Sequence, residues 1–182
     1  MLKKSILAVF TLLILTACGN KNDEKSPEEL QKIIDEGTIG FEMADGVIKK
    51  AENVPANEEK AILAAFNEYV EALNAEEIER YMRTLSKNPK GYNLEEEKKF
   101  VLENFEQYDI KRKVKDTVIT KYTGDEAEVY TDMTADLTEI KTNVKQVNSR
   151  RQITVFIKED GEWKVSSVFA YSGNNSSNNT GN

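Results

Sequence analysis

Cys18 is the only cysteine in the chain and the residue with the clearest chemical potential. A lone thiol cannot form an internal disulfide, and the absence of histidine excludes a cysteine–histidine nucleophile pair. The residues before it indicate a different chemistry. Lys3 and Lys4 give a positively charged start, residues 6–15 are almost entirely apolar, and the small residues 16–17 directly precede the cysteine. This order is typical of a secretory signal that is cut after a small-residue site.

The apolar run is too short to remain in a membrane as a helix, because ten residues reach only about 15 Å of a ~30 Å hydrocarbon core. The sequence LTAC at residues 15–18 resembles the lipobox of bacterial lipoproteins. The resemblance implies that the thiol of Cys18 receives a diacylglyceryl group, that residues 1–17 are removed, and that the new amino terminus is acylated. The alternative is a cysteine buried in an ordinary helix, which the order of charge, apolar run and small residues disfavours. We therefore expect a protein lipid-anchored to the cell membrane on its extracytoplasmic side.

The charge of the chain limits its partners. The formal net charge is −7, and removal of the signal takes away two lysines and makes the protein more acidic. Nucleic-acid binding depends on Lys and Arg that neutralise phosphates, so we expect no nucleic-acid partner. Without histidine or a second cysteine a zinc site is not expected, and no glycine-rich phosphate loop is present. We predict no metal and no cofactor.

Composition divides the chain into four parts. Residues 1–17 form the signal peptide, and residues 18–54 comprise the lipidated cysteine, a polar linker and a short helical segment whose capping signals lie at 26–37. Residues 55–172 are long enough for one domain with its own core. Residues 173–182 lack apolar side chains and are predicted to be disordered.

The first half of the predicted domain has helical periodicity. Apolar residues recur at helical spacing over 58–74, and Asn74 is placed to cap a second helix over 75–85. Asn93 is placed to cap a third helix that reaches residue 108. Three helices are therefore expected before any strand of the domain.

The second half alternates with a period of two, which is typical of half-buried strands. The expected strands cover 109–122, 126–141, 152–158 and 162–171, with a polar link over 142–151 and a tight turn at Glu-Asp-Gly. Four antiparallel strands after three helices predict an α+β fold with helices on one face of a curved sheet.

Two stretches carry a resemblance to a known family. FNEYVEALNAEEIERYM (66–82) is similar to the opening helix pair of the nuclear transport factor 2-like superfamily, also called the cystatin-like cone fold. RRQITVFIKEDGEWKVSSVFAY (150–171) is similar to its closing hairpin. The resemblance covers about residues 56–172 and implies the fold. It leaves function open, because the superfamily contains enzymes, ligand binders and assembly modules.

The sequence favours a non-catalytic domain that binds a small ligand or an envelope protein. Enzymes of the superfamily use carboxylates, tyrosines and often histidine, and the absence of histidine removes the commonest base at neutral pH. We therefore predict no catalytic residue. Two alternatives stay open: an enzyme like polyketide cyclases or ketosteroid isomerases that uses Asp/Tyr acid–base chemistry, and an accessory assembly module of a membrane complex.

The resemblance also implies a pocket between helices and sheet. Its candidate lining is Tyr69 and Tyr81 from the helices, with Arg112 and Asp116 from the first long strand. By strict alternation the arginine and the aspartate share a face, where a pair would orient a polar ligand group. Alternatively, this end of the strand is exposed and Arg112 merely extends the basic run that begins at Lys111.

Overall fold

The computed structural model describes residues 43–44 and 47–172. The chain divides into a unit of residues Met1–Thr38 and a unit of residues Ile39–Asn182, and the described residues all belong to the second. The predictions on the signal peptide, on Cys18, on the helix at 26–37 and on the tail at 173–182 lie outside the described residues. Within them, no helix is long and apolar enough to cross a membrane.

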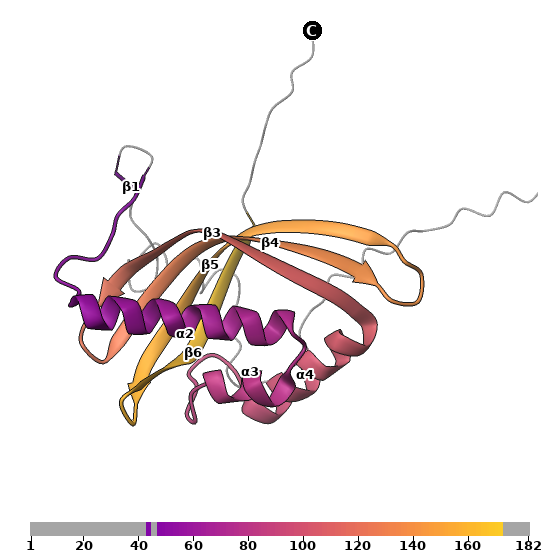
Figure 1. The fold of residues 1–182 in the computed structure, drawn as a ribbon, viewed down its shortest axis with the longest axis horizontal. Coiled ribbons are helices and arrows are strands. Elements are labelled where there is room, and N and C mark those ends of the chain that lie inside the picture. The colour runs from indigo at the N-terminus through magenta and orange to yellow at the C-terminus, as the bar shows by residue number, and fades with distance from the viewer. Residues whose placement is uncertain (1–42, 45–46, 173–182) are drawn as a thin grey trace, which may run out of the picture. The chain divides into compact units, whose positions relative to one another are not determined.

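Three helices precede the long strands. They are α2 (Ala56–Asn74), α3 (Ile78–Thr84) and α4 (Leu94–Gln107), and they lie along one side of the sheet (Figure 1). α4 begins as the sequence predicts, because the Asn93 side chain accepts hydrogen bonds from the backbone N–H groups of Glu95 and Glu96. α3 begins later than predicted. Glu76 adopts a positive φ of 59°, so the chain turns before a helix can start.

The four long strands form one antiparallel sheet in the order β3 (Tyr108–Tyr122), β4 (Glu126–Glu139), β5 (Lys145–Glu159) and β6 (Glu162–Ser172). The β5–β6 turn is the predicted one, since Asp160 and Gly161 have the two positive φ angles that a tight hairpin needs. A separate short hairpin, β1 (Met43–Ala44) and β2 (Val47–Ile48), precedes them. The α+β class with three helices and a four-stranded antiparallel sheet is confirmed.

The predicted polar link at 142–151 is wrong, because β5 already begins at Lys145. Residues 145–151 pair with the end of β4 in continuous register, although their side chains are exposed. Backbone pairing needs no apolar side chain, so a period-two apolar pattern cannot report this part of the strand.

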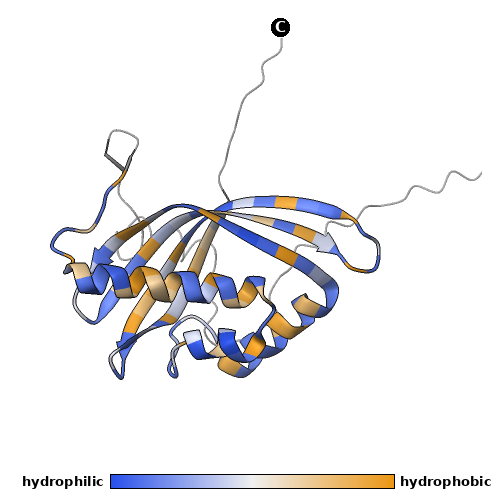
Figure 2. Ribbon diagram, in the orientation of Figure 1, coloured by the Kyte–Doolittle hydropathy of each residue, from blue (hydrophilic) through white to orange (hydrophobic). Residues whose placement is uncertain are grey.

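The main core lies between the helices and one side of the sheet. Residues alternate in hydropathy along the strands (Figure 2), and the apolar set on the helix-facing side joins that of α2. Fully buried examples are Ile62 and Phe66 on α2, Val129 on β4, Phe156 on β5 and Val165 on β6.

A smaller apolar cluster lies on the opposite side of the sheet, formed by Tyr130, Ile153 and Val155. Ile48, before the predicted domain start at residue 55, packs against this cluster, while Ala51 and Val54 pack against the main core. The backbone N–H of Ala51 also donates to the carbonyl of Ile119 at 2.8 Å. The boundary at 55 stays a prediction, and these contacts supply a means to test it.

Glu58 joins the first turn of α2 to the β5–β6 hairpin. Lys158 Nζ lies 2.8 Å from Glu58 Oε1, and Trp163 Nε1 donates to Glu58 Oε2 at 2.9 Å. These hydrogen bonds lower the pKa of the Glu58 carboxyl below its ordinary value of 4.5. Lys158 Nζ also lies 5.5 Å from the centroid of the Trp163 ring.

Candidate ligand-binding site

The position of Arg112 is determined by the end of α2. Asn74 does not cap α3 as predicted, because its amide group binds the backbone of Arg112 on β3. Asn74 Nδ2 donates to the Arg112 carbonyl at 2.8 Å, and the Arg112 N–H donates to Asn74 Oδ1 at 2.8 Å. The side-chain amide therefore acts as a short piece of strand and joins the C-terminus of α2 to β3.

The Arg112 side chain is partly buried and incompletely bonded. Its Nη1 atom is inaccessible to solvent and has no hydrogen-bond partner, and no ion pair of this arginine occurs among the described residues. Burial lowers the pKa of the Arg112 guanidinium, and the charge of Arg150 acts in the same direction. Electrostatic interaction with Tyr69 and Tyr81 opposes both effects, so the two tyrosines lie close enough to sense the guanidinium.

The two tyrosines form the helical wall of this cluster. The ring centroids of Tyr69 on α2 and Tyr81 on α3 are 5.8 Å apart and tilted by 42°. The Tyr81 hydroxyl donates to Glu97 Oε1 on α4 at 2.5 Å. Burial raises the pKa of Tyr69 to about 12, and burial also raises the pKa of Tyr81. Both hydroxyls are therefore protonated at neutral pH, and that of Tyr81 donates to Glu97.

The sheet contributes two residues that the sequence did not single out. Gln152 on β5 is buried, donates to Thr154 Oγ1 at 2.9 Å, and lies close enough to the Tyr69 hydroxyl to lower its pKa slightly against the effect of burial. Arg150 lies two residues earlier and shares its face. It fell in the predicted polar link, so its face could not be assigned. Recognition of residues 145–151 as strand would have placed it on the helix-facing side.

Asp116 does not join the cluster. Its φ of 53° accompanies a register shift between Lys115 and Val118, so the alternation of faces is interrupted after Arg112. The Asp116 carboxylate is exposed, lies 3.6 Å from Lys115 Nζ, and acts on Tyr130, which belongs to the cluster on the opposite side of the sheet. The expected Arg112–Asp116 pair is therefore wrong, because a bulge separates the two residues.

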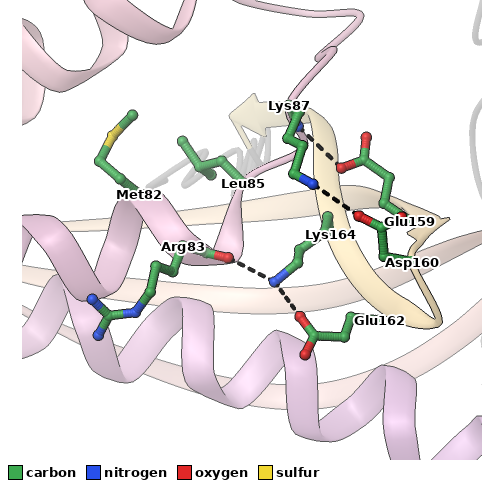
Figure 3. A pocket seen from close by; sticks show the side chains of 8 residues that line it. All are labelled: Met82, Arg83, Leu85, Lys87, Glu159, Asp160, Glu162 and Lys164. Carbon is green, nitrogen blue, oxygen red and sulfur yellow. Dashed lines mark hydrogen bonds and ion pairs between the residues drawn. The ribbon is translucent and has the colours of Figure 1, made fainter.

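Two surface clefts lie elsewhere, beside α3 and the β5–β6 turn. One has a volume of about 290 Å³ and is drawn in Figure 3. The other has a volume of about 530 Å³ and extends along α2. Neither is lined by Tyr69, Tyr81, Arg112 or Asp116.

Two lysines that line the smaller cleft are paired with carboxylates. Lys87 Nζ lies 2.8 Å from Asp160 Oδ2, and Lys164 Nζ lies 2.6 Å from Glu162 Oε2 (Figure 3). Because these groups already have partners, they offer a ligand less than the unsatisfied guanidinium of Arg112. Over residues 43–44 and 47–172, no group of three or more His, Cys, Asp or Glu is arranged to hold a metal ion.

Comparison with protein families gives one match. Residues 64–170 match the model of the family described as "Anti-sigma-I factor RsgI9, C-terminal domain". No curated protein matches the chain.

Comparison with solved structures identifies the fold. A ketosteroid isomerase-like protein from Erwinia carotovora atroseptica is 20% identical over 64% of this chain and 96% of its own, with a TM-score of 0.53. A member of the nuclear transport factor 2-like family from Streptomyces avermitilis is 15% identical over 64% and 97%, with a TM-score of 0.57. A hexachlorocyclohexane dehydrochlorinase from Novosphingobium barchaimii is 11% identical over 64% and 87%, also with a TM-score of 0.57. These identities support the nuclear transport factor 2-like fold and nothing finer.

Proposed function

The chain belongs to the family defined by the C-terminal domain of anti-sigma-I factor RsgI9, and we propose that it is a non-catalytic recognition domain. We further propose that lipid on Cys18 holds the protein at the extracytoplasmic face of the membrane. Its domain binds a small ligand on the helix-facing side of the sheet. The binding residues are Tyr69, Tyr81 and Arg112, joined by Gln152.

One observation carries the ligand-binding proposal: the buried Nη1 atom of Arg112 has no partner. A buried donor without a hydrogen bond costs about 1–3 kcal/mol, and more when it is charged. Asn74 binds both the N–H and the carbonyl of this residue and so fixes the Arg112 backbone beside the end of α2. A ligand that accepts a hydrogen bond from Nη1 would recover this free energy on binding.

The tyrosines support recognition over acid–base catalysis. A general base works best when its pKa lies near the working pH. Burial raises the pKa of Tyr69 to about 12 and raises that of Tyr81 as well, away from that range. The protonated Tyr69 hydroxyl beside the Arg112 guanidinium offers donors that suit a ligand with acceptor atoms, whereas the Tyr81 O–H is already donated to Glu97.

An enzyme of Asp/Tyr type is the second candidate, and one contact favours it. The 2.5 Å hydrogen bond from Tyr81 to Glu97 joins a hydroxyl and a carboxylate on the inner side of the domain. A carboxylate beside a phenol can exchange protons with a bound substrate. Under this alternative Glu97→Gln abolishes turnover of a bound compound, whereas under the recognition proposal no bound compound is altered.

The ligand proposal is tested by thermal melting of the purified full chain with a library of bacterial metabolites. Compounds that bind should raise the melting temperature of the wild type and of Arg151→Gln, whose side chain lies on the opposite face of β5. Arg112→Gln should bind the same compounds roughly 10- to 150-fold more weakly, as expected for a lost charged hydrogen bond. If no compound raises the melting temperature, the ligand proposal is rejected.

The anchoring proposal is tested by fractionation. The wild type should remain in the membrane fraction after a carbonate wash, because two acyl chains hold a protein firmly. Cys18→Ala should be recovered uncut or released. Retention of the variant in the washed membranes contradicts lipidation at this residue.

A further inference from the structure

Two arginines lie on the helix-facing side of the sheet, on either side of β4. Arg112 pairs in register with Ala135, and Arg150 pairs with Met133, two residues along the same strand. Because strands are spaced about 4.8 Å apart, the two backbones are roughly 10 Å from each other. Their charges interact, since Arg150 contributes to the lowered pKa of Arg112. An anion placed between them would meet both guanidinium groups.

These arginines have no carboxylate partner within the described part of the chain, although the protein is acidic. Arg80 on the outer surface shows the contrast, because Glu68, Glu71 and Glu77 all lie within 3.3 Å of its guanidinium. One carboxylate does face the cluster, that of Glu97. It accepts the hydrogen bond of Tyr81 and forms no ion pair with either arginine in the described residues.

The same face of the sheet offers apolar surface beside the positive charge. Val114, next to Arg112 on its face of β3, is 39% exposed. An exposed aliphatic side chain beside a cation suits a ligand with one charged end and one apolar end.

We propose that the ligand of this site is a small monocarboxylate with an apolar body, its carboxylate bound between Arg112 and Arg150 and its apolar part lying on Val114. A planar guanidinium matches a carboxylate by paired hydrogen bonds. The bound carboxylate also removes the repulsion between the two arginines. This inference rests on the proposed ligand-binding function and adds the chemical class of the ligand.

The test is calorimetric titration of the full chain with acetate, hexanoate, octanoate, octanamide and inorganic phosphate. Octanoate should bind more tightly than acetate, because the longer chain covers apolar surface, and at least tenfold more tightly than the uncharged octanamide. Arg112→Gln and Arg150→Gln should each weaken octanoate binding at least tenfold. Arg151→Gln, one residue along β5 and facing the other side, should leave it unchanged. Arg150 is exposed, so Arg150→Gln should fold. This variant therefore still tests the inference if Arg112→Gln fails to fold.

Four results would overturn the inference. In the first, octanamide binds as tightly as octanoate, and in the second, Arg150→Gln leaves octanoate binding unchanged. In the third, phosphate binds more tightly than octanoate through the same arginines, and in the fourth, no carboxylate binds. If library compounds still raise the melting temperature through Arg112 in any of these cases, the recognition proposal stands and only the ligand class is wrong. If nothing binds, both proposals fail together.

Discussion

Replacing Arg112 by methionine should stabilise the protein in the absence of ligand. The guanidinium is held inside the domain with an unpartnered Nη1 atom, while its aliphatic stem packs as an apolar chain would. Methionine retains most of that stem and removes the unsatisfied charge. A gain in stability on this substitution is expected for a residue that serves binding and lowers the stability of the free protein.

The size of the effect follows from burial. An unsatisfied buried polar group costs about 1–3 kcal/mol, and the part of Arg112 that reaches solvent reduces this to about 1–2 kcal/mol. For a domain of this length, 1 kcal/mol changes the melting temperature by roughly 3–5 °C. Arg112→Met should therefore melt about 3–10 °C above the wild type.

The measurement is urea and thermal unfolding of the full chain, followed by circular dichroism. Arg151→Met is the matched control and should change the free energy of unfolding by less than ~0.5 kcal/mol. Arg112→Lys keeps the charge in place and should give no stabilisation. If Arg112→Met instead loses more than ~1 kcal/mol, the guanidinium makes a stabilising contact and the argument for an empty binding position is refuted.

Three further predictions concern the fold. The folded-state pKa of Glu58 lies below its ordinary value of 4.5, so the stabilising effect of this carboxylate is present above that pH and is lost as pH falls through the lowered pKa. In urea titrations, Glu58→Gln should therefore lose less of its free energy of unfolding than the wild type between about pH 5 and pH 3. An equal loss in the two proteins contradicts this prediction. Gly91→Ala should cost about 1–3 kcal/mol in urea unfolding, since a Cβ at Gly91 would lie 2.9 Å from Ser167 Cβ, and a neutral result would show that β6 shifts freely. A chain of residues 55–172 should unfold cooperatively, but its free energy of unfolding should be about 1–3 kcal/mol lower than that of a chain of residues 47–172, because it loses the packing of residues 48–54. Equal melting temperatures of the two chains would show that residues 48–54 lie outside the folded unit.

Local features of the fold were predictable because their causes are local. The period of apolar residues locates α2, and the Asn93 side chain caps α4 from within its own turn. The β5–β6 hairpin follows from Asp160 and Gly161, whose residue types favour the positive φ angles of the turn. Each of these outcomes depends on residues only a few positions apart.

The candidate site was predictable only in part. Tyr69 and Tyr81 lie on apolar helix faces, and both side chains are buried, while their role in a ligand pocket stays a prediction. Arg112 was expected among them by strand alternation, and it lies there because no bulge precedes it. Alternation failed for Asp116, since a register shift between Lys115 and Val118 moves the side chains that follow to the other face until a second shift between Ile119 and Lys121 restores the alternation.

The sequence by itself determined the order of three helices and four strands, the acidic charge, and the absence of histidine chemistry. It also placed one arginine among apolar neighbours on a strand. Only the tertiary structure decided that Asn74 binds the backbone of Arg112, that Arg150 lies across β4 from it, and that Asp116 faces away. The physical reason is that helix periods and turns arise from neighbours in sequence, whereas strand register, bulges and the partners of buried polar groups depend on segments that meet only when the chain has folded.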